Sequence, residues 1–149
     1  MHKTVTLNAG ASTFGSEESF GMIRSGQVDV SILGAFQVSS KGDLANYMIP
    51  NKLMKGMGGA MDLVSNPLKT KVIIVMEHCD KYGNSKIVDR CSLPLTGMEC
   101  ISKIITDLAV FEVQNRELVL TDIADTITLD ELKSKTLATF RLSDDLKTF

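Results

Sequence analysis

Residues 4–34 read TVTLNAGASTFGSEESFGMIRSGQVDVSILG, and this order of residue types decides the fold class. Thr4–Leu7 is β-branched and apolar and predicts a strand, which a glycine-containing turn follows. Ser16 offers a helix N-cap before two glutamates, and Gly26 stands where a helix C′ residue belongs. Val28–Leu33 then predicts a second strand. Strand, turn, helix and strand in this order form the unit of an open α/β sheet.

The rest of the chain predicts further elements of one α/β domain spanning residues 1–149. No internal repeat, low-complexity tract or linker interrupts it. The expected elements are, in order, a long loop region with short strands (Ala35–Met61), a buried strand (Lys71–Glu77), another strand (Lys86–Cys91), a helix (Thr96–Asp107), a pair of strands (Leu108–Val113 and Leu118–Thr121) and a short helix opened by a capping box (Thr128–Glu131).

The composition argues against several classes of function. The net charge is −2, and no run of lysines and arginines is longer than two residues, so we expect no nucleic-acid partner. The longest apolar run, Val72–Met76, is too short to span a bilayer, so we expect no membrane segment. Three cysteines without paired spacing predict reduced thiols in a cytosol-like compartment.

The segment Lys55–Asp62 contains three glycines in four positions, 56 to 59. Glycine lets backbone N–H groups approach a ligand closely. A dinucleotide fingerprint fails because Met61 occupies the third glycine position, and no Gly-Lys-Ser/Thr follows to make a phosphate loop. Two interpretations remain. One is a backbone N–H site for a developing oxyanion or a thioester carbonyl, and the other is a tight turn between strands.

Two further regions carry polar groups. Gly34 follows a strand directly, at the edge where ligands bind in open α/β sheets. Gly42–Pro50 adds polar side chains there, although Asp43 and Asn46 would also suit ordinary turn hydrogen bonds. Glu77–Asp80 offers a histidine beside a cysteine, but neighbouring residues of a strand point to opposite faces. We therefore expect no Cys–His dyad and no metal site.

The motifs, taken together and in order, resemble the β subunit of the 3-oxoacid CoA-transferases of the succinyl-CoA:3-ketoacid type. The resemblance runs from about Val5 to about Phe140. The motifs that carry it are Gly10-Ala11-Ser12, Ser19-Phe20, Met22-Ile23-Arg24, Gly42-Asp43-Leu44-Ala45-Asn46, Met48-Ile49-Pro50, the highly specific block Lys55–Val64, Met76-Glu77-His78, Leu93-Pro94-Leu95-Thr96-Gly97 and Asp107-Leu108-Ala109-Val110-Phe111.

The resemblance implies an open, mostly parallel α/β sheet of the CoA-transferase type, with antiparallel strand pairs towards the C-terminus. It also implies a hetero-oligomer with an α subunit, in which CoA moves between succinyl-CoA and a 3-oxoacid such as acetoacetate, a reaction of ketone body metabolism. A glutamyl-CoA thioester would carry the group, and no cofactor would be needed besides the CoA thioester substrate. The expected location is the cytoplasm, or the mitochondrial matrix in a eukaryote.

The resemblance assigns roles to particular residues. The backbone N–H of Gly59 would support the oxyanion, and Gly58 and Ala60 would shape its loop. Residues of the segments Gly34–Val38 and Asp43–Ile49 would line the pocket for the acyl group and the pantetheine arm of CoA. The site residues expected in those segments are Gly34, Gln37, Asn46 and Met48.

One departure from the family pattern concerns the nucleophile. The family glutamate lies in a Ser-Glu-Asn-Gly motif, and none of the seven glutamates of this chain precedes Asn-Gly. We therefore expect the chain to be the C-terminal part of a β subunit, to be inactive alone and to expose apolar surface that the missing parts would cover. The alternative is a non-catalytic interaction or regulatory module with the same fold.

Overall fold

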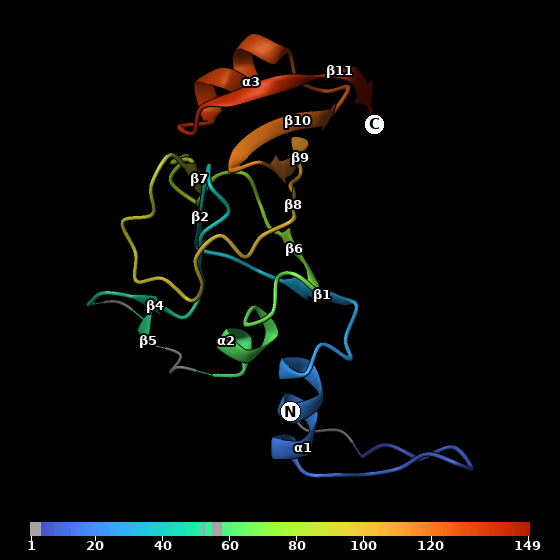
Figure 1. Ribbon diagram of the computed structural model, residues 1–149. Helices are drawn as coiled ribbons and strands as arrows, with labels where there is room; N and C mark the ends of the chain where they lie inside the picture. Colours follow the sequence, from blue (N-terminus) through green and yellow to red (C-terminus); the bar gives the residue numbers. More distant parts are fainter. Residues whose placement is uncertain (1–3, 52, 55–57) are drawn as a thin grey trace.

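The fold is described from a computed structural model, which places residues 4–51, 53–54 and 58–149. Figure 1 shows the arrangement of the elements. The strands and helices are, in chain order, α1 (Ser16–Arg24), β1 (Val30–Leu33), β2 (Gln37–Ser39), β3 (Leu44–Ala45), β4 (Met48–Ile49), β5 (Leu53–Met54), α2 (Ala60–Leu63), β6 (Lys71–Val75), β7 (Ile87–Val88), β8 (Lys103–Ile105), β9 (Ala109–Gln114), β10 (Glu117–Ile123), α3 (Leu129–Lys135) and β11 (Phe140–Thr148).

A six-stranded sheet in the order β1-β6-β8-β9-β10-β11 forms the frame of the molecule. β1, β6 and β8 pair in parallel, and so do β10 and β11. β9 runs antiparallel to both of its neighbours. The expected α/β class is confirmed, with a mostly parallel sheet and antiparallel pairs towards the C-terminus. In Figure 1, α1 and α2 lie at the β1 end and α3 lies at the opposite end.

One face of this sheet forms the core. Along β6 the side chains of Val72 and Ile74 are fully buried, whereas those of Lys71 and Val75 are exposed, as the period of two in a strand requires. Phe111 of β9 is also fully buried and packs edge-on against Phe140 of β11, with ring centroids 5.4 Å apart. Apolar side chains from β2, β3, β6, β7, β8, β9 and β10, together with Leu132 of α3, make up the core.

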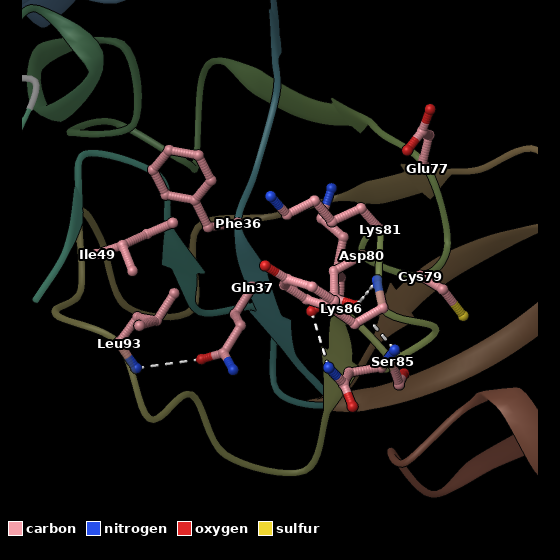
Figure 2. A pocket seen from close by; sticks show the side chains of 12 residues that line it. Phe36, Gln37, Ile49, Glu77, Cys79, Asp80, Lys81, Ser85, Lys86 and Leu93 are labelled. Atoms are coloured by element: carbon pink, nitrogen blue, oxygen red, sulfur yellow. Dashed lines mark hydrogen bonds between the residues drawn. The ribbon is translucent and has the colours of Figure 1, made fainter. Parts of the chain in front are cut away.

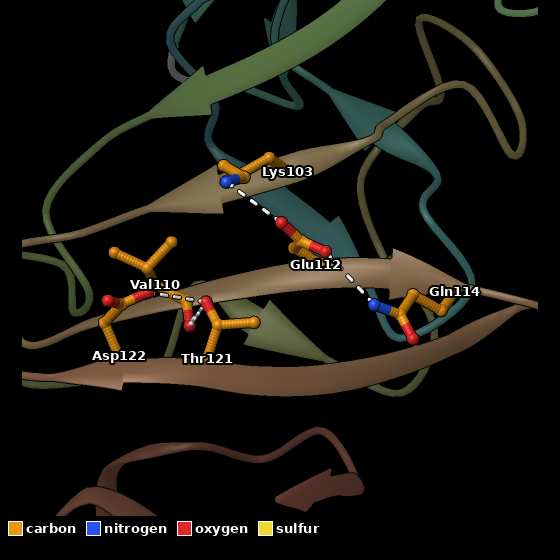
Figure 3. A network of polar contacts seen from close by, with 6 residues as sticks. All are labelled: Lys103, Val110, Glu112, Gln114, Thr121 and Asp122. Carbon is orange, nitrogen blue, oxygen red and sulfur yellow. Dashed lines mark hydrogen bonds and ion pairs between the residues drawn. The ribbon is translucent and has the colours of Figure 1, made fainter. Parts of the chain in front are cut away.

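The other face of the sheet carries polar pairs. Lys103 of β8 and Glu112 of β9 lie opposite each other in register, and their Nζ and Oε1 atoms are 3.0 Å apart. Gln114 donates to the second oxygen of the same carboxylate, as Figure 3 shows. These bonds hold the pKa of Glu112 below its usual value. Such cross-strand pairs help to fix the register of β8 against β9.

Local sequence signals explain three of the elements. Gly26, at a φ of +77°, ends α1 in the left-handed conformation that favours glycine, as expected. Asn115 and Arg116 both have positive φ and make the tight turn between β9 and β10. Thr128 and Glu131 form the expected capping box at α3. The N-cap of α1 is Gly15 rather than Ser16.

Two predicted elements were wrong. Thr4–Leu7 is not a strand. The expected helix over Thr96–Asp107 is absent. The segment contains bends and then β8, which lies between β6 and β9. Pairing on both sides satisfies the backbone of β8, and this tertiary pairing outweighs a stripe of apolar residues at helical spacing. Thr96, expected as a helix cap, instead donates its hydroxyl to the side chain of Asn46.

Candidate functional site

A cavity of about 870 Å³ lies beside the three-stranded sheet β3-β2-β7. Figure 2 shows the side chains around it. They come from the start of β2, from β4, from the loop between β6 and β7, and from the segment after β7. The lining residues are Phe36, Gln37, Ile49, Glu77, Cys79, Asp80, Lys81, Tyr82, Asn84, Ser85, Lys86 and Leu93. Its size lies in the range of small-molecule sites.

Strand pairing brings Gln37 and Lys86 together from distant parts of the chain. β2 and β7 run parallel with Val38 opposite Ile87, and both of these side chains are fully buried. The residue before each of them must point to the other face, which is the cavity side. The N–H of Val38 also donates to the carbonyl of Lys86 at 2.9 Å. Gln37 and Lys86 therefore stand next to each other on the cavity wall.

The side chain of Gln37 is oriented by the segment after β7. Its Oε1 atom accepts hydrogen bonds from the N–H of Ser92 at 2.9 Å, the hydroxyl of Ser92 at 3.1 Å and the N–H of Leu93 at 3.1 Å. Figure 2 shows the bond to Leu93. With the oxygen engaged, the amide nitrogen is the end of the side chain that remains to donate to a ligand.

The loop that bears the lysines is held by Asp80. One carboxylate oxygen accepts from the N–H groups of Tyr82 and Asn84, and the other accepts from the Asn84 side chain. Gly83, at a φ of +86°, makes the turn, and the N–H of Lys86 returns to the carbonyl of His78. The loop is therefore a tight hairpin whose second arm presents Lys86.

The cavity is lined by two lysines and two acidic residues. The ammonium groups of Lys81 and Lys86 form no salt bridge with any residue in the described part of the chain. Burial lowers the pKa of Lys86, opposed by Glu77, Asp107 and Asp80. The ammonium of Lys81 lies over the ring of Tyr82 at 4.9 Å. This cavity can therefore offer a partly desolvated cation to an anionic ligand.

The thiols are protonated structural groups. Burial raises the pKa of Cys79, which lines the cavity, and raises those of Cys91 and Cys100 to about 11 and about 12. The thiolate is the nucleophilic form of cysteine, so none of the three is activated. No cluster of His, Cys, Asp and Glu in the described residues could hold a metal ion.

His78 anchors the cavity wall from behind. Its side chain is fully buried between the neighbours Glu77 and Cys79, which line the cavity. Its ring nitrogens lie 3.1 Å from the hydroxyl of Thr106 and 2.9 Å from that of Thr136. The ring thus ties the end of β6 to the end of β8 and to the end of α3. Burial is the main cause that lowers the pKa of His78.

His78 is expected to make the fold sensitive to mild acid. Because its folded-state pKa lies below the ordinary histidine value of 6.5, the unfolded chain binds a proton first as pH falls through 6.5. The free energy of unfolding should then fall by up to about 1.4 kcal/mol per pH unit until the folded-state pKa is reached. Urea denaturation at pH 7.5, 6.5 and 5.5 measures this slope.

The control for that prediction is His78→Gln, which keeps a hydrogen-bonding side chain but does not titrate. This variant should be less stable at pH 7.5 and should lack most of the slope between pH 6.5 and 5.5. The pKa values of carboxylates such as Glu112 and Glu131 are lowered from 4.5. Their protonation therefore changes the free energy of unfolding only below about pH 4.5 and does not affect the slope between pH 6.5 and 5.5. An equal slope in both proteins would show that His78 is not the acid-sensitive group.

Four of the predicted site residues lie close to this cavity or to one another. Gln37 lines the cavity, and Met48 immediately precedes Ile49, which also lines it. The amide nitrogen of Asn46 donates to the carbonyl of Gly34 at 3.1 Å. Asn46 itself is held by Thr96, which bonds both its backbone N–H and its side-chain oxygen. The structure therefore joins the end of β1 to the segment after β3.

No described residue of the glycine segment is among the residues that line this cavity. Lys55, Gly56 and Met57 are outside the described residues, so the predicted loop is seen only from Gly58 onwards. Gly58 is exposed, Gly59 is the N-cap of α2, and Ala60 begins that helix. A Cβ at Gly59 would overlap the ring of Phe20 in α1, so a larger residue there would have to displace that ring. Its N–H donates to no other described residue.

A path of contacts links the end of α2 to the cavity region. Val64 follows α2 and is buried against Gly97, where an added Cβ would lie 2.7 Å from a Val64 methyl group. The carbonyl of Gly97 accepts from the N–H of Leu44 in β3, and Thr96 holds Asn46. α2 is thus connected through the segment 96–97 to the strand that leads to Asn46.

Sequence reasoning missed Lys81, Tyr82 and Lys86. The local signal was present, since Asp80 followed by Gly83 and Asn84 is typical of a tight turn. What the sequence does not give is the pairing of β2 with β7, which places Lys86 beside Gln37. Among the described residues, no helix is long and apolar enough to cross a membrane.

Comparison with known proteins places the chain in a family. A family model described as Coenzyme A transferase matches residues 1–135. The chain is 54% identical over 140 residues to the β subunit of the succinyl-CoA:3-ketoacid coenzyme A transferase of Helicobacter pylori, an alignment that covers 94% of the chain and 67% of that protein. It is 48% identical over 146 residues to the human mitochondrial succinyl-CoA:3-ketoacid coenzyme A transferase 2, covering 97% of the chain and 28% of that protein.

The fold has a counterpart among solved structures. An acyl-CoA transferase from Escherichia coli O157:H7, solved as a thioester complex with CoA, superposes with a TM-score of 0.81 at 21% identity, covering 99% of this chain and 33% of that one. This likeness supports the fold alone. The chain spans about two thirds of the bacterial β subunit and a smaller share of the mitochondrial protein. With more than half of its aligned residues identical to those of a β subunit, and with a family match over most of its length, this chain belongs to the coenzyme A transferase family.

Proposed function

We propose that the chain forms part of the β subunit of a CoA-transferase that moves CoA between succinyl-CoA and a 3-oxoacid such as acetoacetate. The similarity to such a β subunit over 94% of the chain carries this proposal. The cavity supports it, because it offers cationic and amide donors to an anionic substrate. The CoA thioester is the substrate, and the proposal includes no further cofactor.

The proposed reaction uses a glutamate carboxylate. It attacks the thioester carbonyl, the CoA thiolate leaves, and an acyl-glutamate anhydride remains. The thiolate then attacks the glutamate carbonyl of the anhydride, which releases the first acid and leaves a glutamyl-CoA thioester. The second acid receives CoA by the reverse of these steps. None of the seven glutamates of the chain lies in the family's motif, so the nucleophile belongs to a segment outside these 149 residues.

In this proposal the chain supplies binding and charge stabilisation. The N–H of Gly59 donates to the oxyanion that develops in each attack, and it is not used by any other described residue. Gly58 and Ala60 shape the loop around that N–H. The acyl group and the pantetheine arm lie along a pocket that includes Gly34, Gln37, Asn46 and Met48, for which the bond between Asn46 and Gly34 provides a fixed wall.

The proposed partners are a CoA-transferase α subunit and the remaining part of the β subunit. β1 is an edge strand of a parallel region, and parallel sheets are normally covered on both faces. Here Val30, Ile32 and Val75 expose 44%, 66% and 49% of their surface. These apolar side chains support a docking face for a partner segment. The proposed location is the cytoplasm, or the mitochondrial matrix in a eukaryote.

The proposal is tested by adding an α subunit and a segment with the nucleophile motif to the chain. The chain alone should transfer no CoA from succinyl-CoA to acetoacetate. Mixed with an α subunit and a segment that carries the Ser-Glu-Asn-Gly motif, it should form acetoacetyl-CoA. A matched segment with Ser-Gln-Asn-Gly should assemble equally well in size-exclusion chromatography and give no transfer. Assembly without transfer by the glutamate-bearing segment would contradict the proposal and favour a non-catalytic regulatory module.

A further inference from the structure

We propose that the outer face of the six-stranded sheet binds one amphipathic helix from the remaining part of the β subunit, with an acidic residue of that helix beside Lys71. The outer face is the face of the sheet that points away from the core. This inference rests on the proposed function for its choice of partner, but the docking itself is measured without any transfer reaction.

Strand register places six apolar side chains together on the outer face. In β6 the side chains of Val72 and Ile74 point into the core, so the residues that alternate with them point outwards. Residues paired in register share a face, so β1, β8 and β9 continue this face on either side of β6. The six residues, called the outer stripe, are Val30, Ile32, Ile73, Val75, Ile105 and Val110.

The outer stripe is accessible and long enough for a helix. Val30, Ile32 and Val75 expose 44%, 66% and 49% of their surface, and the other three residues are half-buried. The stripe runs diagonally over four strands, from Val30 on β1 to Val110 on β9, which is about 20 Å at the usual strand spacing and rise. A helix of about 13 residues has this length. Contiguous apolar surface of this kind is typical of a partner site.

The connections between parallel strands contribute to the opposite face. Val64 lies between β1 and β6, Ile87 between β6 and β8, and Leu132 between β10 and β11. All three side chains belong to the same core cluster as Val72, so each of these connections packs on the core face. Parallel strands are normally covered on both faces. A covering element for the outer stripe is therefore expected from outside the described residues.

The helix α1 is held in another place. Arg24 at its end forms an ion pair with Asp62 of α2, with 2.7 Å between Nη1 and Oδ1. The side-chain amide of Asn66 donates to the carbonyl of Arg24 at 3.4 Å. The ring of Phe20 lies against Gly59 at the start of α2. These contacts tie α1 to α2 and not to the outer stripe.

The charges beside the stripe determine the kind of helix that fits. Lys71 lies opposite Val30 and is exposed on the outer face. Its ammonium group has no salt-bridge partner among the residues that the structure places. Lys103, opposite Ile73, is already paired with Glu112, as Figure 3 shows. A helix with an apolar stripe and an acidic residue beside Lys71 is therefore complementary to this surface.

A second copy of the chain fits this surface less well. Two outer faces packed together would bury the pair of Lys103 and Glu112, whose side chains are now 37% and 35% exposed. Removing an ion pair from water costs more than its attraction returns in most settings. A single helix, about 10 Å across, can cover the apolar residues and leave this pair in water.

The first experiment titrates the 149-residue chain with the part of the Helicobacter pylori β subunit that lies outside the alignment, about a third of that protein. Isothermal titration calorimetry measures the Kd. Ile32→Asp should raise the Kd about 10²-fold, because the burial of an isoleucine is lost and a carboxylate meets an apolar helix face. Leu137→Asp is the matched control, because Leu137 is 67% exposed and lies outside the stripe. It should leave the Kd unchanged.

A second variant tests the charge of the helix. Lys71→Glu should raise the Kd about 5-fold at low salt, and the difference should shrink at high salt, which screens exposed charges. Lys133→Glu, at an exposed position on α3, is the control and should bind like the parent. Because Ile32 and Lys71 are exposed, both variants should keep the circular dichroism spectrum of the parent. Tighter binding by Lys71→Glu would overturn the acidic character of the helix.

Photo-crosslinking identifies the element that covers the stripe. p-Benzoylphenylalanine in place of Ile32, in an assembly with the added β part and an α subunit, should cross-link to the β part. The same analogue in place of Val75 should label the same helix at a different turn. Cross-links to the α subunit or to a second copy of the chain would overturn the proposal. So would an assembly without cross-links at either position, or equal Kd values for the parent and Ile32→Asp.

Transfer activity separates this inference from the proposed function. Binding that Ile32→Asp weakens, in an assembly that transfers no CoA, would uphold the inference and reject the proposed function. Transfer that saturates at the same concentration of the β part in the parent and in Ile32→Asp would overturn the inference alone.

Discussion

Replacing Gly59 with proline, in an assembled transferase that already carries Phe20→Ala, is expected to lower kcat by about 10²-fold to 10³-fold. That is the usual cost of removing one oxyanion donor. The N–H of Gly59 donates to no other described residue, and the proposed function assigns it to the substrate oxyanion. Proline removes this N–H and nothing else that the backbone needs, because Gly59 has a φ of −57°, which a proline ring adopts.

The Phe20→Ala background is needed because any side chain at position 59 would overlap the Phe20 ring. Without it, a substitution at Gly59 would move α1 against α2 and confuse a packing effect with a chemical one. Gly59→Ala in the same background is the matched control, since it adds a Cβ but keeps the N–H. It should retain most of the turnover of the Phe20→Ala enzyme.

Turnover is measured as initial rates of acetoacetyl-CoA formation at saturating substrate. A loss of less than about 5-fold in the proline variant would mean that the N–H of Gly59 does not stabilise the oxyanion, since a lost donor costs far more. Equal large losses in the alanine and proline variants would point to packing at α2 as the cause. Either result would contradict the assignment of the Gly59 N–H as an oxyanion donor.

Phe111→Ala is expected to cost the fold about 3–5 kcal/mol, the range for a fully buried phenylalanine. The ring lies at the centre of the core, edge-on to Phe140 and 6.2 Å from the ring of His78. Its removal would leave a cavity between β9 and β11 and loosen the histidine that anchors the wall. Because domains have only about 5–15 kcal/mol of stability, this single change should bring the protein close to unfolding.

Urea denaturation at pH 7.5 measures that loss. Val110→Ala is the control from the same strand, because Val110 points to the opposite, half-buried face. It should cost about 1 kcal/mol, the central value for point substitutions. If Phe111→Ala cost no more than Val110→Ala, the packing described for the β9–β11 region would be wrong.

Much of the fold could be predicted from local signals. Three features depend only on residues that are close together in the chain and can be recognised in the sequence. They are Gly26 after α1, the capping box at Thr128 and the turn at Asn115-Arg116. The buried strand β6 followed from a run of apolar β-branched residues. The prediction of a helix over Thr96–Asp107 was wrong because the spacing of its apolar residues also suits a helix. Only the pairing of β8 with β6 and β9 makes part of this segment a strand.

The candidate site also contains residues that could be predicted from the sequence and residues that could not. Gly34 could be singled out because it follows a predicted strand, and Asn46 was assigned by the family resemblance. The structure joins them by a hydrogen bond. Lys86 could not be placed, because its position beside Gln37 depends on the register of β2 against β7, which are far apart in the chain. The close approach of the Phe20 ring to Gly59 could not be predicted either, because it depends on how α1 packs on α2.

Mass spectrometry of the assembled enzyme, treated with succinyl-CoA and digested, identifies the residue that carries CoA. We expect one CoA adduct, on the glutamate of the added Ser-Glu-Asn-Gly segment, and none on any peptide of the 149-residue chain. The adduct should be absent when the segment carries glutamine instead. A CoA thioester on one of the seven glutamates of this chain would contradict the account and identify a different nucleophile.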